Sequence, residues 1–177
     1  MEIPAKKGFS VIATANTRDK GVNEMSAALK RRFNIVVLPT PASLETEIDI
    51  VKTRVEQLSG GMELNASLPE SDVVEKVCTI FRELRNGETC DKSQKLKTTP
   101  GVLSTAESIS LLCGSMALAG SFGNGKVSDE DLAAGLAGAV IKEEDKDVTA
   151  WKEYLENVMK KRGSKWSGLY NACRELL

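Results

Sequence analysis

The prolines of Pro39-Thr40-Pro41 divide the sequence into two parts of different character. Proline has a fixed φ and no backbone N–H, so neither a helix nor a strand ladder continues through this stretch. Before it, β-branched apolar runs are separated by polar residues. After it, helix start signals recur and alternation with a period of two disappears. We therefore expect a hinge or linker here, between two parts with different secondary structure.

The part before the linker contains two apolar runs, Val11–Ala15 and Ile35–Leu38, that predict strands. Between them lie a polar stretch and a short helix-like segment, SAALKRRF, which includes Lys30-Arg31-Arg32. Two strands alone make a poor sheet, because independent stability needs a third strand or helical cover. The first forty residues are therefore expected to be the tail end of an α/β domain whose beginning is absent.

The part after the linker predicts a bundle of about six helices. Ser43 precedes apolar residues at helical spacing, and Asn86-Gly87 is a good left-handed helix end. Capping-box patterns occur at Ser67–Glu70, Ser104–Glu107 and Ser128–Asp131. The polar segment Glu88–Pro100, which carries three lysines, predicts a loop, with a flat basic hairpin as the alternative.

The composition excludes several classes of partner and site. With 24 basic and 25 acidic residues the net charge is −1, which gives no general attraction to nucleic acid or to anionic membranes. No apolar run approaches the roughly 20 residues that span a bilayer, and the first residues lack the apolar core of a signal peptide. We expect no nucleic-acid or membrane partner and a cytoplasmic location.

The absence of histidine and the scattered cysteines exclude further chemistry. Zinc sites and Ser-His or Cys-His nucleophiles need residues that the sequence does not supply, since the four cysteines form no C-x-x-C pair. We expect no metal site. Cys78 and Cys113 lie in apolar helical stretches and are expected to be reduced core residues.

The stretch Gly120–Ser128, GSFGNGKVS, nearly matches a phosphate-binding loop. That motif requires a hydroxyl residue after its lysine to hold Mg²⁺, and here Val127 follows Lys126. The preceding segment has helical rather than strand character. A glycine-rich turn between two helices, with Lys126 in solvent, is the physical interpretation.

The segments VIATANT and SAALKRRFNIVVLPTP resemble the AAA+ ATPases, in particular the MoxR-like branch, in which a strand ending in A-T-x-N precedes an A-L-x-x-R-F segment. The helical part of this chain is similar to the AAA+ lid and the C-terminal helices of a bacterial MoxR-like group. The resemblance implies a mainly α chain: a C-terminal remnant of the AAA+ α/β core, with about two strands, followed by a helical lid bundle.

The resemblance implies roles for three residues near the N-terminus. Asn16 takes the sensor 1 position, where an amide can donate to the γ-phosphate and orient the attacking water. Arg32 takes the arginine-finger position, with Arg31 as the alternative, and would stabilise charge on the phosphoryl group in a neighbouring subunit. Without the resemblance, Asn16 is a turn residue and the arginines are a surface cluster at a helix C-terminus.

The sequence departs from the family pattern in two places. The Walker A loop and the Walker B strand, expected before sensor 1, are absent from the chain. At the usual sensor 2 position stands Ala106, followed by Glu107. Sensor 2 is therefore lost or supplied elsewhere, and Lys97 is the proposed substitute in nucleotide binding.

The sequence thus predicts the C-terminal portion of a MoxR-like AAA+ ATPase, with core residues 1–41, a lid over 42–145 and a helical extension over 146–177. The parent would bind ATP and Mg²⁺ in a homo-oligomeric ring and act on a client protein, by chaperone-like remodelling or metal insertion. This chain alone is expected to bind neither ATP nor Mg²⁺ tightly and to be inactive as an ATPase. The alternative is a non-catalytic helical interaction module derived from an AAA+ lid.

Overall fold

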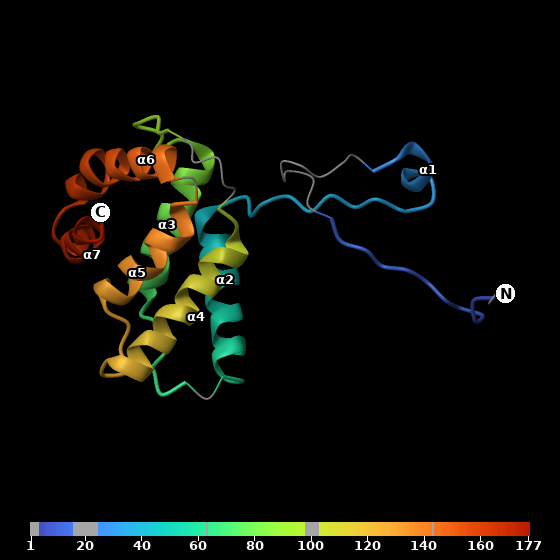
Figure 1. Cartoon of the computed structure of the whole chain (residues 1–177), viewed down its shortest axis with the longest axis horizontal. Helices are drawn as coiled ribbons and strands as arrows, with labels where there is room; N and C mark the ends of the chain where they lie inside the picture. Colours follow the sequence, from blue (N-terminus) through green and yellow to red (C-terminus); the bar gives the residue numbers. More distant parts are fainter. Residues whose placement is uncertain (1–3, 16–24, 63, 98–102, 143) are drawn as a thin grey trace. The chain divides into compact units, whose positions relative to one another are not determined.

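The computed structural model describes residues 4–15, 25–62, 64–97, 103–142 and 144–177 (Figure 1). The chain divides into two compact units, Met1–Leu38 and Pro39–Leu177. Asn16 lies outside the described residues.

The described residues of the first unit form one short helix, α1 (Ala27–Lys30). Ser26 is its N-cap, because the Ser26 hydroxyl accepts a hydrogen bond from the backbone N–H of Leu29 at 3.2 Å. The short helix predicted for SAALKRRF is confirmed at this place. It ends next to Arg31, whose backbone N–H donates to Ala27 O.

The two strands predicted in the first unit are not present among its described residues, so this part of the fold prediction is corrected. Ile12 is 94% exposed and Val36 is 78% exposed. The physical reason is the absence of a partner: a strand needs a hydrogen-bonded neighbour and cover for its apolar face, and neither is found within the described residues. The β-branched residues of these segments indicate a preference for strand conformation, but this preference does not form a strand without a pairing partner.

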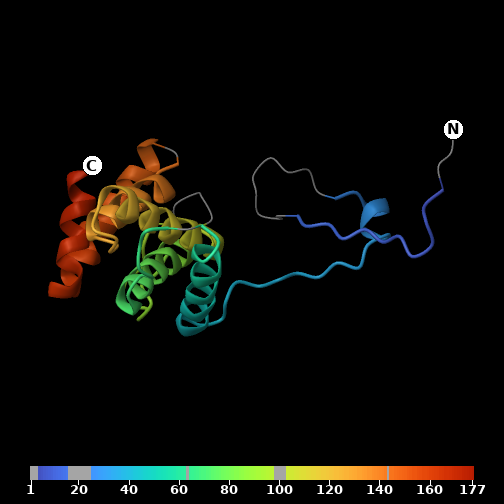
Figure 2. The same ribbon diagram turned by 90° about the horizontal axis from the view of Figure 1, so that it is seen from below.

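The second unit is a bundle of helices (Figures 1 and 2), so the prediction of a mainly α fold is confirmed. Its elements are α2 (Leu44–Ser59), α3 (Ser71–Asn86), α4 (Thr105–Phe122), α5 (Asp129–Val140), α6 (Glu144–Asn157), the 3₁₀ helix η1 (Met159–Arg162) and α7 (Ser164–Glu175). Helix α4 packs against α2, α3 and α5, whereas α7 packs against α5, α6 and η1.

One apolar core runs through this helical unit. Most of its largest fully buried side chains come from α3, α4, α5 and α6, among them Phe81, Leu112, Leu136, Trp151 and Tyr154. The Trp151 and Tyr154 rings stack with their centroids 5.7 Å apart. Cys78 and Cys113 are buried free thiols, as expected, and burial raises the pKa of Cys78 to about 12. No helix within the described ranges is long and apolar enough to cross a membrane.

Most of the predicted helix ends are confirmed. Ser43, Ser104 and Ser128 are the N-caps of α2, α4 and α5, and the last two form complete capping boxes. Gly87 ends α3 in the left-handed conformation, with φ 70°.

The capping box predicted at Ser67–Glu70 is wrong, because α3 begins at Ser71 with Glu70 as its N-cap and without a side-chain cap. Ser67 instead bonds the carbonyl of Gly125, through its N–H at 2.8 Å and its hydroxyl at 3.1 Å. Ser67 therefore bonds Gly125, which is 58 residues away in the sequence, and not the nearby residue Glu70.

The lysine-rich segment between α3 and α4 turns back on itself. Glu88 and Lys95 form an isolated antiparallel bridge, and Leu96 N–H donates to Gly87 O at 2.8 Å. Asp91 closes the tip by accepting hydrogen bonds from Thr89 and Ser93. The segment therefore combines the predicted loop with a minimal hairpin contact, and we call residues 88–97 the hairpin loop.

Candidate functional site

The two candidate arginine-finger residues follow α1 directly. Arg31 is the C-cap of α1, and the backbone N–H of Arg32 donates to Leu29 O at 2.9 Å. Both side chains are exposed. The C-terminal end of a helix carries partial negative charge, which favours cations there. The local fold thus presents two guanidinium groups to solvent, where a group from another molecule can reach them.

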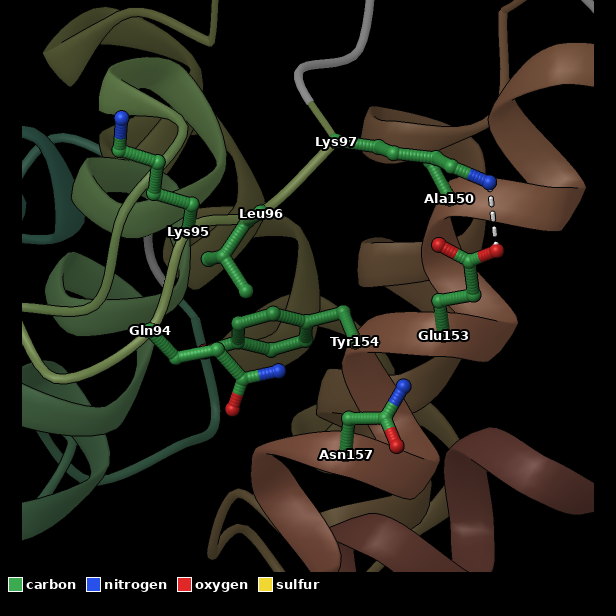
Figure 3. A pocket seen from close by; sticks show the side chains of 8 residues that line it. All are labelled: Gln94, Lys95, Leu96, Lys97, Ala150, Glu153, Tyr154 and Asn157. Atoms are coloured by element: carbon green, nitrogen blue, oxygen red, sulfur yellow. Dashed lines mark hydrogen bonds and ion pairs between the residues drawn. The ribbon is translucent and has the colours of Figure 1, made fainter.

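Lys97 is the sequence-predicted residue that the structure places at a hollow. A pocket of about 320 Å³ lies between the hairpin loop and α6 (Figure 3). The residues that line it are Gln94, Lys95, Leu96, Lys97, Ala150, Glu153, Tyr154 and Asn157. The Lys97 ammonium reaches across to α6, where it donates a 2.6 Å hydrogen bond to Glu153 Oε1.

The pocket is lined by both polar and apolar side chains. Figure 3 shows the Gln94 side chain on the hairpin loop and the Asn157 side chain on α6 on opposite sides of the hollow. Leu96 points toward the ring of Tyr154. A side-chain amide both donates and accepts hydrogen bonds, so such walls suit a polar ligand. An anion that reached Lys97 would have to compete with Glu153.

The glycine-rich stretch 120–128 contains the end of α4 and the turn that connects it to α5, so the predicted turn between two helices is confirmed from Gly123 onward. Gly125 has φ 83°, and a Cβ at this position would lie 3.0 Å from the carbonyl oxygen of Asn65, so both the backbone conformation and the close contact favour glycine. Lys126 is exposed, and its backbone N–H donates to Asn124 Oδ1 at 3.0 Å. The residues before the turn are helical, whereas a phosphate-binding loop follows a strand.

The start of α4 shows what occupies the usual sensor 2 position. Ala106 lies exposed in the first turn of α4. Glu107 is the capping-box residue, whose carboxylate accepts from Ser104 N–H at 2.8 Å. Neither residue offers a cation for a phosphate group. Within the described ranges, no three His, Cys, Asp or Glu side chains gather as metal ligands.

Sequence reasoning missed two buried carboxylates in the helical unit. Glu47 of α2 and Glu83 of α3 are both fully buried. Glu47 accepts from Arg82 at 3.2 Å, from Arg85 at 2.7 Å and from the Thr105 hydroxyl at 2.9 Å. A signal was available: each glutamate lies in the apolar stripe of its helix, where a charge requires a buried partner.

The two carboxylates differ in what they connect. Glu47 joins α2 and α3 to the first turn of α4. Glu83 joins α3 to η1 and α6, since it pairs with Arg162 and accepts from the Tyr154 hydroxyl at 2.6 Å. Burial opposes the ionised form of Glu47, but hydrogen bonding and charge from Arg85 outweigh it and lower the pKa of this carboxyl. Burial and the charge of Glu83 both raise the pKa of Tyr154 well above its ordinary value.

Comparison with known proteins assigns both parts of the chain to one class. Residues 1–33 match the AAA domain of the dynein-related subfamily, and residues 45–176 match the YehL-like AAA+ ATPase C-terminal domain. The class is therefore the AAA+ ATPases, as the sequence predicted. Within it, the chain belongs to the family of the YehL-like AAA+ ATPase C-terminal domain.

A curated relative agrees with this assignment. The uncharacterized protein YehL of Escherichia coli (strain K12) is 33% identical over 177 residues, which cover 99% of this chain and 48% of the relative. The chain thus spans about half the length of the curated relative that it matches. No solved structure matches the chain.

Proposed function

We propose that this chain acts as the C-terminal portion of an ATPase that couples ATP hydrolysis in an oligomeric ring to work on a client protein. The observation that carries the proposal is the order of the two family matches, an AAA domain over residues 1–33 and the C-terminal domain over 45–176. The first unit would be the end of an α/β core, and its exposed apolar segments would join a sheet supplied by the rest of that core. The helical unit would be the lid with its C-terminal extension.

In this proposal Asn16 is the sensor 1 residue of the subunit's own nucleotide site. A neutral amide donates a hydrogen bond to the γ-phosphate or to the attacking water without the cost of a pKa shift. Arg32 acts on the nucleotide of the neighbouring subunit, with Arg31 as the alternative. A guanidinium is permanently charged and binds phosphate oxygens in a planar fork, which suits it to this role. The exposure of both arginines supports an intermolecular role.

Lys97 is the proposed cation for the missing sensor 2 arginine. Its ammonium pairs with Glu153, another residue that lines the pocket, and both side chains are exposed. An exposed pair of this kind is worth only about 0–1 kcal/mol, so a phosphate group can displace Glu153 at little cost. ATP and Mg²⁺ would be held mainly by a phosphate-binding loop and an acidic strand outside this chain.

The work done on the client is proposed from family resemblance alone, as MoxR-like chaperone action, either remodelling or metal insertion. The competing proposal is a non-catalytic helical interaction module. One observation favours this alternative: the apolar core of the helical unit is made only of residues from 39–177, so this unit has a core of its own without the first unit.

One experiment separates the two proposals. Residues 1–177 are placed after a segment that carries a phosphate-binding loop and an acidic strand of the same family, and Mg²⁺-dependent ATP hydrolysis and assembly size are measured. Hydrolysis that depends on Asn16 and Arg32 supports the ATPase. A protein that neither binds nucleotide nor assembles overturns it and leaves the interaction module.

A further inference from the structure

The linker that enters the helical unit is held by a side chain from α3. Arg82 donates hydrogen bonds to two consecutive backbone carbonyls, that of Pro41 at 3.1 Å and that of Ala42 at 2.7 Å. Its Nη1 also donates to Glu47 Oε2 at 3.2 Å. One planar guanidinium therefore binds the linker and the first turn of α2 together.

Glu47 holds the guanidinium through the same Nη1 that donates to the carbonyl of Pro41. This carboxylate is fully buried and also accepts from Arg85 and Thr105, so its own position is set by three partners on two other helices. Buried charges cost free energy unless their geometry is well satisfied, which restricts Arg82 to the orientation in which it meets the two carbonyls. The contact is thus directional rather than a loose surface pair.

We propose that Arg82 is a positioning residue that fastens the linker to the helical unit, so that Pro41 and Ala42 move with that unit. Any change in the direction of the chain then takes place before Pro41. The inference rests on the proposed function in one respect. The linker connects the segment of Arg32, the proposed arginine finger, to the lid, so the contact of Arg82 with Pro41 and Ala42 determines how a movement of the lid is transmitted to Arg32. Its structural content can be tested without ATP.

The chain offers a matched control on the same carboxylate. Arg85 also donates to Glu47, but its second bond goes to the carbonyl of Leu103, before α4, and none goes to the linker. Arg82→Gln and Arg85→Gln each leave one guanidinium opposite Glu47. A role in stability alone would affect both variants in the same way, whereas a positioning role affects the linker only in Arg82→Gln.

The test is backbone amide relaxation by NMR on residues 1–177. The amides of Ala42 and Ser43 belong to the peptide groups whose carbonyls Arg82 binds. We expect order parameters of about 0.85 for both in the wild type and below about 0.6 in Arg82→Gln, with Arg85→Gln unchanged at these two residues. The amides of Val51 and Val55 in α2 report in the same spectra that the bundle is folded.

Unchanged order at Ala42 and Ser43 in Arg82→Gln, or equal loss in Arg85→Gln, would overturn the inference. If Arg82→Gln does not fold, Arg82→Lys serves instead. Lysine keeps the charge but replaces the planar, two-nitrogen fork with a single flexible ammonium, so the paired geometry to the two carbonyls is lost and the amides of Ala42 and Ser43 should become more mobile. In the longer ATPase, Arg82→Gln should lower kcat for ATP with little change in KM. An inactive wild type would overturn the proposed function, and the relaxation data would still decide the role of Arg82.

Discussion

The hydroxyl of Tyr154 donates a 2.6 Å hydrogen bond to the buried carboxylate of Glu83, which links a residue that lines the pocket to the interior of the helical unit. Glu83 also accepts from the Cys90 N–H at 2.8 Å and pairs with Arg162. The carboxylate thus connects α3, the hairpin loop, α6 and η1. The hairpin loop and α6, which together line the pocket, are therefore both held by the buried carboxylate of Glu83.

The first prediction concerns this network. Tyr154→Phe should lower the free energy of unfolding by about 1.5–3 kcal/mol, the range for a hydrogen bond to a charged group. Glu83→Ala should cost about 3–5 kcal/mol, because it leaves the Arg162 charge without its buried partner. Urea unfolding followed by far-ultraviolet circular dichroism measures both changes.

Tyr170→Phe is the matched control for the tyrosine. The Tyr170 hydroxyl makes a bond of the same 2.6 Å length, but to Glu156, an exposed carboxylate that water can solvate. Its loss should cost clearly less than the loss of the Tyr154 hydrogen bond, because water can replace the hydroxyl at an exposed carboxylate. Equal costs for the two tyrosine variants would contradict the view that burial makes the Glu83 network important.

The second prediction concerns the contact of α7 with α5. A Cβ on Gly168 would lie 2.0 Å from Asp129 Oδ2, so Gly168→Ala forces the carboxylate aside. We expect a loss of about 1–3 kcal/mol of unfolding free energy. Adding Asp129→Ala should recover much of it, and the double-mutant cycle gives the coupling between the two positions.

Gly114 is the control for the effect of alanine in a helix. It lies in α4, and a Cβ placed there meets nothing within 4 Å. Gly114→Ala should therefore raise stability by about 0.4–1 kcal/mol. A Gly168→Ala variant as stable as Gly114→Ala would show that the helices adjust without cost.

The third prediction is a pH dependence that arises from Glu47. Its pKa is lowered from 4.5 because the bonds and charge of Arg85 outweigh burial. The unfolded chain therefore takes up a proton first as the pH falls. The stabilisation is fully present above 4.5 and is lost as the pH falls through the lower pKa of the folded state.

Glu47→Gln isolates this contribution from those of the other carboxyl groups. The difference in unfolding free energy between wild type and Glu47→Gln should be largest at neutral pH and shrink below pH 4.5. Unfolding midpoints at a series of pH values measure it. A difference that stays constant down to pH 2 would show that Glu47 is not stabilised as an ion.

These contacts also show which features a sequence can reveal. Ser104 and Ser128 were predictable as N-caps because their partners, Glu107 and Asp131, lie three residues away. Ser67 matched the same pattern, but its hydroxyl bonds Gly125, 58 residues further along the chain. Patterns report local bonds well, and they fail where a distant group competes for the same side chain.

The difference between local and long-range contacts also explains which site residues could be predicted from the sequence. The exposed positions of Arg31 and Arg32 follow from a short helix and its end, so local reasoning was enough. The partners of Glu47 lie on α3 and α4, and Val11 to Ala15 form no strand because no partner strand lies beside them among the described residues. Such relationships depend on which segments meet in space, and periodicity does not determine that.

The fourth prediction is that residues 1–177 alone bind ATP weakly or not at all. The glycine-rich turn before α5 lacks the hydroxyl that would hold Mg²⁺, and the described residues offer no cluster of metal ligands. Isothermal titration calorimetry with Mg²⁺ present should show no binding at micromolar protein. Tight, Mg²⁺-dependent binding would contradict this, and variants of Lys97 and Lys126 would then locate the site.

The last prediction separates the roles of Asn16 and Arg32 in a longer protein that carries a phosphate-binding loop. Arg32→Ala should leave ATP affinity nearly intact and lower turnover by a factor of about 10³–10⁵, since a finger acts only in the transition state. Asn16→Ala should also spare binding and impair hydrolysis. Steady-state turnover and equilibrium ATP binding are measured on each variant.

Mixing subunits distinguishes a residue that acts on the neighbour from one that acts in its own site. Arg32→Ala subunits keep an intact nucleotide site, and subunits with a broken phosphate-binding loop keep Arg32, so their mixture should recover some activity at shared interfaces. Asn16→Ala subunits mixed with the same loop variant should recover almost none, because every site is then defective. If Arg32→Ala hydrolyses ATP at the normal rate, Arg32 is not the finger, and Arg31, exposed beside it at the end of α1, is the next residue to replace.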